Sequence, residues 1–520
     1  MSRFGPAEPT STRWDVRRLN RPNLLWGSNG VSFGPDGRLY VAEYLGARIC
    51  AVDTATGDVE VVEPVEGPVR SPDDLAFGAD GSMYITDLVP GVVWRRSPAG
   101  EYTVVSDEVA VPNGITCVGD RLFVNEMRPG GRVLELTGGT STVLADDLAM
   151  GNAMQLGPDG WLYYPHMLTG TVHRVPPDGG AAELVVADVL EPVAVRFDRG
   201  GVLHVLSRGG AGVVTRVDLF GTGGRALVTS GIAGLDNGAF DAENRLFVSS
   251  FASGGITELH PDGRTRTVVE PGFDGPYGVV VDLGGRVRVA DHYRVAAPDG
   301  ADGVSTEALL VFSHGIAVSP SGTLHLTSQF GDVRDHDPAT GRTEVRAAGL
   351  DRPTGVAVRA DGALVVAETG AGRVLVVDAG VSVLVEGLTA PVDVAVDGDR
   401  CWVSDESAGA VYEVVDGVAV LLADGLGAPQ GIAVLGGDLL VVDTSGKRLL
   451  AVDTATGEVR VDAEDLPVGL PAGVVRGDTG LRCHGMPGMA PQFAGLATGP
   501  DGAVLLSANG EGTVLRLTPR

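Results

Sequence analysis

The chain has 520 residues and a formal net charge of −28 at pH 7. This excess of acid argues against nucleic acid and an anionic membrane as partners, because both require a basic surface that displaces counterions. Hydrophobic residues make up 44% of the sequence, which is enough for more than one core, since single cores stop growing at roughly 250 to 300 residues. The 77 glycines and 31 prolines favour many tight turns over long helices.

The N-terminal segment, residues 1–23, lacks the apolar centre of a secretory signal, and no apolar run approaches the roughly 18 to 20 residues of a membrane span. A cytoplasmic protein is therefore expected. The four cysteines are far apart and include no CxxC pair, so they predict neither a disulfide framework nor a zinc site. They are Cys50, Cys117, Cys401 and Cys483.

The first predicted element is a strand at residues 12–19, TRWDVRRL, which has no blade of its own. Residues 29–64 follow, with the sequence NGVSFGPDGRLYVAEYLGARICAVDTATGDVEVVEP. This segment contains four short runs of alternating apolar residues, separated by PDG, by a glycine-containing loop and by TATGD. The pattern predicts four antiparallel strands joined by hairpin turns.

The same pattern recurs along the chain, and most repeats lie 37 to 44 residues apart. A period near 40 residues is typical of propeller blades. The exception is the step of 64 residues before the last repeat, where GLPAGVVRGDTGLRCHGMPGMAPQF predicts an added loop. The first strands open at Asn29, Asp73, Asn113, Asn152, Val193, Asp236, Tyr277, His314, Thr354, Val392, Gln430 and Ala494.

Twelve repeats predict an all-β protein of two tandem six-bladed β-propellers, because a four-stranded sheet buries both faces only by stacking in a ring. We expect an N-terminal arm at residues 1–19 and propellers at residues 20–271 and 272–520. The last blade has only three strands of its own, so the strand at residues 12–19 is predicted to supply its outer strand. A single larger ring is the alternative.

The strand-opening residues of one ring should converge, because the first strand of each blade lines the axis. In the first half they offer three amides and two carboxylates, oxygen ligands that suit Ca²⁺ or another divalent cation. The candidate metal ligands are Asn29, Asp73, Asn113, Asn152 and Asp236. The alternative is that they bond only turn amides, as PNG and DNG sequences commonly do.

Resemblance to a known family is concentrated in four segments: SNGVSFGPDGRLYVAE, VPNGITCVGDRLFVNEM, MGNAMQLGPDGWLYYPH and LDNGAFDAENRLFVSSF. They resemble the senescence-marker-protein/gluconolactonase/luciferin-regenerating-enzyme family, which also includes diisopropyl fluorophosphatase. The resemblance implies a six-bladed propeller that holds a central divalent ion by a Glu, one or two Asn and an Asp, and that hydrolyses lactones or other esters. Asn113 and Asn152 match the family's asparagines. Asn29 and Val193 replace its first-blade Glu and fifth-blade Asp.

Three residues are candidates for acid and base chemistry. Asp73 belongs to the axial set, and Glu126, in VNEM, occupies a place where the resemblance implies contact with substrate. An acid at this place also recurs in blades without such a site, as at Glu43 and Asp443, so bonding to turn amides is the alternative. His166, in YYPHM, departs from the repeat, and a histidine with an ordinary pKa near 6.5 can shuttle a proton.

The expected function is a divalent-metal-dependent, gluconolactonase-like hydrolase that acts on a lactone or ester of a small oxygenated molecule. The ion would polarise the carbonyl and stabilise the developing oxyanion. A metal-dependent isomerase or lyase acting on a small molecule is one alternative, and a non-catalytic binding platform is another. The sequence leaves the oligomeric state open.

The second half offers no comparable set of oxygen ligands. Its axis is lined by Tyr277, His314, Thr354 and Gln430, which suit hydrogen bonding to an organic ligand or a peptide. The segment PTGVAVRADGALVVAE resembles the repeats of streptogramin lyases. That resemblance implies a metal-independent lyase site that uses His314, His292 or Tyr293.

Overall fold

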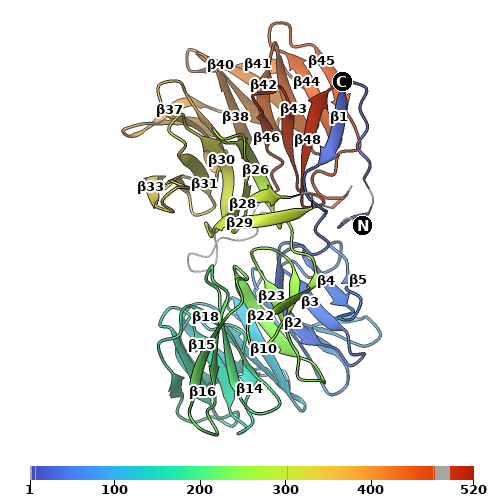
Figure 1. The fold of residues 1–520 in the computed structure, drawn as a ribbon, viewed down its shortest axis with the longest axis vertical. Helices are drawn as coiled ribbons and strands as arrows, with labels where there is room; N and C mark the ends of the chain where they lie inside the picture. Colours follow the sequence, from blue (N-terminus) through green and yellow to red (C-terminus); the bar gives the residue numbers. More distant parts are fainter. Residues whose placement is uncertain (1–2, 6, 301, 472, 475–491) are drawn as a thin grey trace. The chain divides into compact units, whose positions relative to one another are not determined.

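The structure is a computed structural model of the chain, and it describes residues 3–5, 7–300, 302–471, 473–474 and 492–520. The described residues form 48 strands and one short 3₁₀ turn, η1 (Thr369–Ala371). The strands make twelve antiparallel sheets of four strands each (Figure 1). The prediction of an all-β protein with twelve four-stranded blades is confirmed. Most of the predicted added loop, including Cys483, lies outside the described residues.

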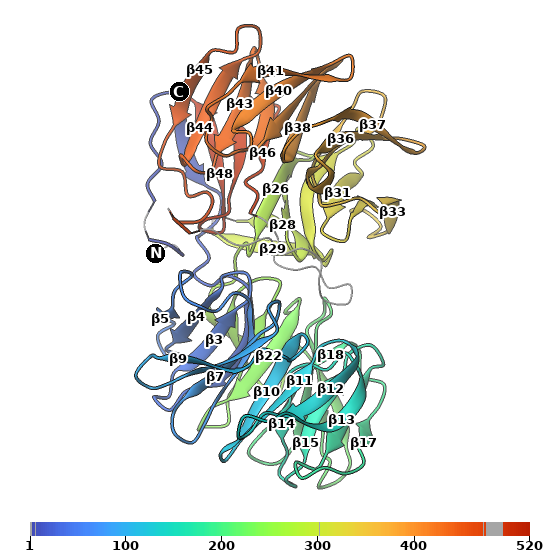
Figure 2. The same ribbon diagram turned by 180° about the vertical axis from the view of Figure 1, so that it is seen from behind.

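The first six blades, blue to green in Figures 1 and 2, each run outward from their first strand. Their strands are β2 (Ser28–Phe33), β3 (Leu39–Glu43), β4 (Arg48–Val52) and β5 (Val59–Glu63) in blade 1; β6 (Pro72–Phe77), β7 (Met83–Asp87), β8 (Val92–Arg96) and β9 (Tyr102–Ser106) in blade 2; β10 (Pro112–Val118), β11 (Arg121–Glu126), β12 (Pro129–Glu135) and β13 (Thr142–Ala149) in blade 3; β14 (Gln155–Leu156), β15 (Leu162–His166), β16 (Thr171–Val175) and β17 (Glu183–Val186) in blade 4; β18 (Pro192–Phe197), β19 (Leu203–Ser207), β20 (Val213–Val217) and β21 (Arg225–Thr229) in blade 5; β22 (Leu235–Phe240), β23 (Leu246–Ser250), β24 (Ile256–Leu259) and β25 (Thr265–Val269) in blade 6.

The next six blades follow the same plan. Their strands are β26 (Pro276–Val281), β27 (Val287–Asp291), β28 (Arg294–Asp299) and β29 (Gly303–Ala308) in blade 7; β30 (Ser313–Val318), β31 (Leu324–Ser328), β32 (Asp332–His336) and β33 (Thr343–Ala348) in blade 8; β34 (Pro353–Val358), β35 (Leu364–Glu368), β36 (Arg373–Val377) and β37 (Val381–Glu386) in blade 9; β38 (Pro391–Asp397), β39 (Arg400–Asp405), β40 (Ala410–Val415) and β41 (Val418–Ala423) in blade 10; β42 (Pro429–Leu435), β43 (Asp438–Asp443), β44 (Arg448–Asp453) and β45 (Val459–Ala463) in blade 11; β46 (Leu496–Thr498), β47 (Val504–Ala508) and β48 (Thr513–Pro519) in blade 12.

The inner strands of each set of six contact one another in a circle. In the first set, contacts run from β2 through β6, β10, β14 and β18 to β22, which contacts β2 again. The second circle runs from β26 through β30, β34, β38 and β42 to β46 and back to β26. Apolar side chains fill the space between neighbouring sheets, as Leu25, Val31 and Phe247 do between blades 6 and 1. The chain therefore forms two six-bladed rings.

The outer strand of blade 12 comes from the start of the chain. Strand β1 (Trp14–Arg18) pairs antiparallel with β48, in the order β1-β48-β47-β46, and Figure 1 shows blue β1 beside red β48. The Trp14 side chain is buried and donates from Nε1 to Asp462 Oδ2 at 3.0 Å. Arg18 pairs with Glu511 at 2.7 Å. The predicted closing strand is thus confirmed.

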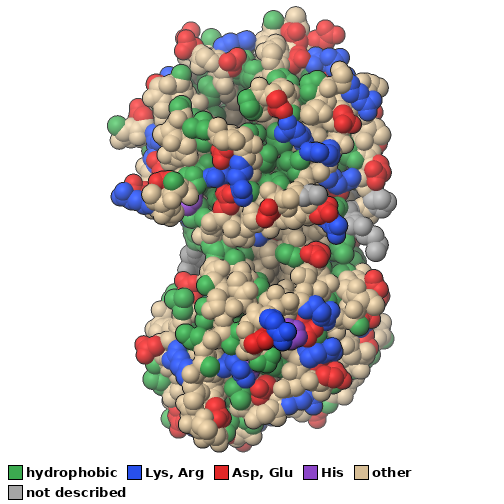
Figure 3. Space-filling view, in the orientation of Figure 1, with side chains coloured by type: hydrophobic (Ala, Val, Ile, Leu, Met, Phe, Trp, Pro, Cys, Tyr) green, Lys and Arg blue, Asp and Glu red, His purple; other side chains and the backbone are tan. Residues whose placement is uncertain are grey.

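The chain divides into two compact units. One contains residues 24–271, and the other contains the N-terminal segment to residue 23 together with the described residues from 272 onward. In the face drawn in Figure 3, basic side chains lie among acidic and hydrophobic ones. Among the described residues, no helix is long and apolar enough to cross a membrane.

Candidate functional site

The strand-opening residues of the first propeller occupy equivalent places because of a β-bulge. Asn29, Asp73, Asn113 and Asp236 are each the second residue of an inner strand, directly after the residue at which the pairing register shifts. A bulge releases its residues from the hydrogen-bonded ladder and re-aims their side chains. Asn152 instead precedes the short strand β14. We call the five polar opening residues, with Asn152 included, the axial ring.

Hydrogen bonds between blades hold the backbone of the axial ring. Thr86 Oγ1 donates to the carbonyl of Asn113 at 2.8 Å, and Ser249 Oγ donates to that of Asn29 at 2.5 Å. Asn125 Nδ2 donates to the carbonyl of Asn152 at 2.6 Å. Each donor lies near the end of a second strand, so neighbouring blades fix the positions of these three asparagines.

The asparagine side chains of the axial ring differ in whether the Oδ1 atom has a hydrogen-bond partner. Among the described residues, the buried Oδ1 atoms of Asn29 and Asn113 have no hydrogen-bond partner. The Oδ1 atom of Asn152 accepts the N–H of Ala153 at 2.7 Å, which is the turn-bonding alternative. The side-chain amides of Asn113 and Asn152 both reach Met127 Sδ, at 3.1 and 3.6 Å. The ring therefore offers two unpartnered amide oxygens.

The two carboxyls of the ring interact electrostatically. Burial and the charges of Asp236 and Asp74 raise the pKa of Asp73 well above its usual range. Burial and the charge of Asp74 raise the pKa of Asp236 to about 7, although Arg208 and Arg196 act to lower it. Among the described residues, neither side chain accepts a hydrogen bond. Both carboxyls thus lack the partners that normally stabilise a buried carboxylate.

These oxygens suit a divalent cation in their chemistry. Two unpartnered amide oxygens and two like-charged carboxyls are groups that a bound cation would satisfy. Within the described ranges, no group of three or more His, Cys, Asp or Glu side chains is placed to hold a metal ion. The fit therefore depends on the asparagine oxygens together with Asp73 and Asp236, and a six-coordinate Ca²⁺ would need water or substrate oxygens as well.

A buried charged network that the sequence analysis missed lies directly after the ring residues in the chain. Asn237 Nδ2 donates to Asp74 Oδ1 at 3.0 Å, and Arg196 donates to Asn237 Oδ1 and to the carbonyl of Gly238. Asp74 also accepts the N–H of Ile115, at 3.3 Å. The adjacent acids in the sequence Asp73-Asp74 were the available signal. Their two side chains have different partners because successive strand residues face opposite ways.

Glu126 is not available as an isolated acid. Its buried carboxylate pairs with Arg132 at 2.5 Å and Arg128 at 3.0 Å, and it accepts the N–H of Ala110 at 3.2 Å. Burial alone would raise the pKa of Glu126, but the hydrogen bonds from the two arginines outweigh it and lower that pKa. Glu43 makes the same kind of pair with Arg48, at 2.7 Å. This arrangement matches the structural alternative for an acid at the end of a second strand.

His166 makes its contacts with residues outside the axial ring. Its ring stacks on His173 with centroids 4.1 Å apart, and its Nδ1 accepts the N–H of Ala149 at 3.4 Å. Burial and the charge of His173 lower the pKa of His166 to about 4. None of its contacts with described residues reaches the ring residues, so the structure does not bring His166 together with Asp73.

The second propeller has an aromatic and polar group at its axis. The rings of Tyr277 and His314 have centroids 4.9 Å apart, and His292 lies 5.7 Å from Tyr277. His292 is fully buried, has a φ of 46°, and burial lowers its pKa to about 3. Gln430 Nε2 donates to Glu406 at 2.8 Å. This group contains aromatic rings where the first propeller has carboxylates.

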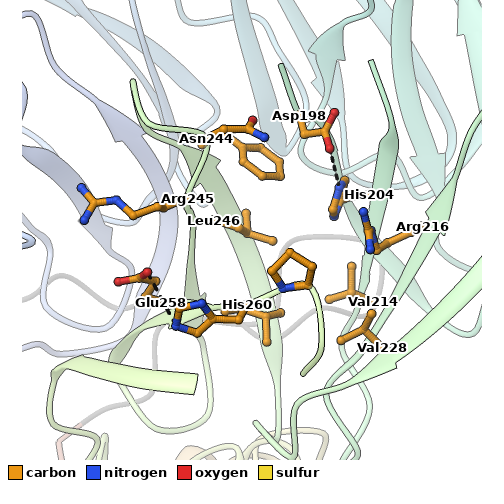
Figure 4. A pocket seen from close by; sticks show the side chains of 13 residues that line it. Asp198, His204, Val214, Arg216, Val228, Asn244, Arg245, Leu246, Glu258 and His260 are labelled. Atoms are coloured by element: carbon orange, nitrogen blue, oxygen red, sulfur yellow. Dashed lines mark ion pairs between the residues drawn. The ribbon is translucent and has the colours of Figure 1, made fainter. Parts of the chain in front are cut away.

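A separate concavity of the first propeller lies between blades 5 and 6 (Figure 4). Its volume is about 100 Å³, and His204 Nε2 lies 3.5 Å from Asp198 Oδ2 at one wall. At the opposite wall, His260 Nε2 lies 3.7 Å from Glu258 Oε1. Arg216 also lines it, and none of the predicted site residues does.

The fold and the axial ring define the first unit as a six-bladed propeller with an oxygen-rich axial site. No protein-family model matches the chain. A gluconolactonase from Zymomonas mobilis is 32% identical over 118 residues, which cover 19% of this chain and 33% of that protein. The predicted resemblance is confirmed over this length. The chain thus spans one third of the curated relative that it matches.

Solved structures similar to part of the chain include a lyase, a calcium-binding protein and a gluconolactonase. A streptogramin B lyase is 17% identical, with a TM-score of 0.40, and the match covers 54% of this chain and 95% of that one. A regucalcin described as a calcium-binding protein, from Agrobacterium tumefaciens, is 22% identical, with a TM-score of 0.37 and coverages of 45% and 85%. A gluconolactonase from Xanthomonas campestris is 19% identical, with a TM-score of 0.38 and coverages of 47% and 95%. With identities of 17 to 22% and TM-scores of 0.37 to 0.40, these structural similarities support no statement about activity.

Proposed function

We propose that the first propeller is a divalent-cation-dependent hydrolase that opens the ring ester of a small lactone. The similarity to a gluconolactonase carries this proposal. The unpartnered oxygens of Asn29 and Asn113 and the carboxyls of Asp73 and Asp236 support it. A cation held by these residues would act as a Lewis acid on the lactone carbonyl.

Asp73 is the proposed general base. Burial is the main cause of the raised pKa of Asp73, and like-charge repulsion from Asp236 adds to it. A cation beside both carboxyls would offset this repulsion and favour the ionised form of Asp73. The carboxylate of Asp73 then takes a proton from the water that attacks the carbonyl carbon. When the ring C–O bond breaks, the same proton passes to the departing alkoxide, and the product is a hydroxy acid.

Of the other two candidates, Glu126 has a supporting part in this proposal and His166 has none. Glu126, neutralised by Arg128 and Arg132, holds the end of β11 and thereby the neighbouring Met127, which contacts Asn113 and Asn152. His166 takes no proton-transfer step, because its pKa is low and its contacts lie elsewhere.

The test combines metal binding with turnover. Calorimetric titration of chelator-treated protein with CaCl₂ should show one site, and hydrolysis of D-glucono-δ-lactone above the uncatalysed rate should require the added cation. Asp73→Asn should lower kcat by roughly 100-fold or more, and Asp236→Asn should weaken cation binding. Asp236→Asn should also lower the melting temperature in CaCl₂ but not in chelator.

Gln430→Asn, on the other axis, is the matched control and should leave cation binding unchanged. Mn²⁺, Mg²⁺ and Zn²⁺ should be tried in parallel, because amide and carboxylate oxygens accept several divalent ions. If no cation binds, and Asp236→Asn melts like the parent protein with and without CaCl₂, the hydrolase proposal fails. The protein is then a binding platform or a metal-free lyase.

A further inference from the structure

Six residues of the first propeller form a second ring next to the axial ring, and we call it the collar. Each collar residue directly follows the last residue of a second strand, and its N–H donates to the carbonyl two residues before its blade's opening residue, at 2.8 to 3.2 Å. Met127, which receives the amides of Asn113 and Asn152, shows that the collar touches the axial ring. The collar consists of Tyr44, Leu88, Met127, Met167, Arg208 and Phe251.

Arg208 is the exception in the collar. The other five members are buried apolar or aromatic side chains, whereas Arg208 is a partly buried cation. Its Nη1 lies 3.6 Å from Met167 Sδ, and its guanidinium carbon lies 5.2 Å from the centre of the Phe251 ring. These contacts with the collar neighbours on both sides hold the guanidinium along the ring. The positive charge of Arg208 also acts electrostatically on the carboxyl of Asp236, so Arg208 lies close enough to influence the axial site.

Arg208 also lacks the acidic partner that arginines near the ends of the second strands have in blades 1 and 3. In blades 1 and 3, the acid that ends the second strand pairs with a nearby arginine, as in Glu43–Arg48 and Glu126–Arg128. In blade 5 that position is Ser207. Among the described residues, no carboxylate lies within ion-pair distance of Arg208. Blade 5 is also the blade whose opening residue, Val193, brings no oxygen to the axis.

We infer that Arg208 binds a carboxylate of the ligand, and that the axial site prefers an acidic lactone to a neutral one. This inference rests on the proposed function only in taking the ligand to be a lactone; the binding of a carboxylate by Arg208 does not depend on it. A guanidinium offers two parallel N–H donors that match a carboxylate. A guanidinium that is already held in place but makes no ion pair with a described carboxylate can bind an anionic ligand without first breaking an internal ion pair. Hydrolysis of such a substrate yields a dicarboxylic hydroxy acid.

Binding tests the inference without requiring catalysis. D-Glucarate and D-gluconate differ only in whether the far end of the molecule is a carboxylate or a hydroxymethyl group. Calorimetric titration of the CaCl₂-loaded protein should show glucarate binding at least 10-fold more tightly than gluconate. Arg208→Met should remove this preference, and Arg208→Lys should keep part of it. Arg216→Met, in the same blade but at the concavity of Figure 4, is the matched control and should keep the full preference.

Turnover separates this inference from the proposed function. The ratio of kcat/KM for D-glucaro-1,4-lactone to that for D-glucono-1,4-lactone should exceed 10 and should fall towards 1 in Arg208→Met, mainly through KM. Turnover of both lactones at equal rates by the parent protein and by Arg208→Met overturns the inference but leaves the hydrolase intact. No turnover, with an Arg208-dependent preference for glucarate, overturns the hydrolase and supports the anion site. Equal binding of both acids overturns the inference.

Discussion

Buried acids in this chain follow two patterns. Several that end second strands pair with an arginine, as Glu126 does with Arg132 and Asp443 does with Arg448. Asp236 and Asp393 lie on inner strands and make no ion pair with a described residue, and burial raises the pKa values of both to about 7. Removing the charge therefore has opposite expected effects in the two groups, because one charge is compensated and the other is not.

Asp393, in the second propeller, allows a test on a buried acid that has no ion-pair partner and lies away from the candidate cation site. A folded-state pKa of about 7 for Asp393, against about 4 when unfolded, means that stability is full at low pH and is lost as pH rises through 7. Asp393→Asn should therefore gain stability relative to the parent protein between pH 4 and pH 8, by on the order of 1 to 4 kcal/mol. Urea unfolding at both pH values measures this. An equal difference at pH 4 and pH 8 would contradict the raised pKa.

Glu126 allows the corresponding test on a buried acid that is neutralised by arginines. Glu126→Gln should lower the free energy of unfolding at pH 7 by about 1 to 3 kcal/mol, because Arg128 and Arg132 lose their charged partner. The pKa of Glu126 is lowered, so the parent's advantage should shrink as pH falls below about 4. A catalytic role would instead show as a loss of kcat with unchanged stability.

At the scale of the element, the inner strand depends on glycines that allow blades to approach closely. A Cβ atom on Gly114 would lie 2.4 Å from the carbonyl oxygen of Asn152 and 2.9 Å from Asn125 Nδ2. The backbone of Gly114 is not in the left-handed region, so the close approach alone requires glycine. Asn125 Nδ2 also donates to the carbonyl of Asn152, so the close approach of blades 3 and 4 holds Asn152 in the axial ring.

Gly114→Ala should push blades 3 and 4 apart where they meet the axis. We expect a loss of about 1 to 3 kcal/mol of stability from overpacking, together with weaker cation binding, because Asn113 and Asn152 must shift. Gly437→Ala is the control, since a Cβ atom there meets nothing within 4 Å. Thermal unfolding and calorimetry of both variants measure the effects, and equal melting temperatures would contradict the close approach.

At the scale of the whole molecule, the ring that contains the chain's last residues is completed by its first strand. Deleting residues 1–20 would expose the edge of β48 and leave the Asp462 side chain without the Trp14 donor. We expect a lower melting temperature and aggregation detectable by light scattering. Trp14→Ala alone should cost about 3 to 5 kcal/mol. A truncated chain as soluble and heat-stable as the parent would show that β1 is dispensable.

The blades and their order could be predicted from the sequence, because each repeat carries its own turn signals, such as PDG and TATGD, between runs of alternating residues. Equal register of the opening residues is also the reason why the sequence predicts that they converge. The roles of individual side chains could not be predicted in the same way. Asn29 and Asn152 look alike in the sequence, yet one amide oxygen is unpartnered and the other accepts a backbone N–H.

The sequence by itself determined the hairpins, the number of blades and the closing strand, because these depend on residues close together in the chain and on one unpaired edge. Only the tertiary structure decided that Arg132 neutralises Glu126 and that Asn237 and Arg196 surround Asp74. It also decided that no carboxylate of the described residues lies within ion-pair distance of Arg208. Several of these partners belong to other blades, and the burial that sets their charge states exists only once the sheets have stacked around the axis.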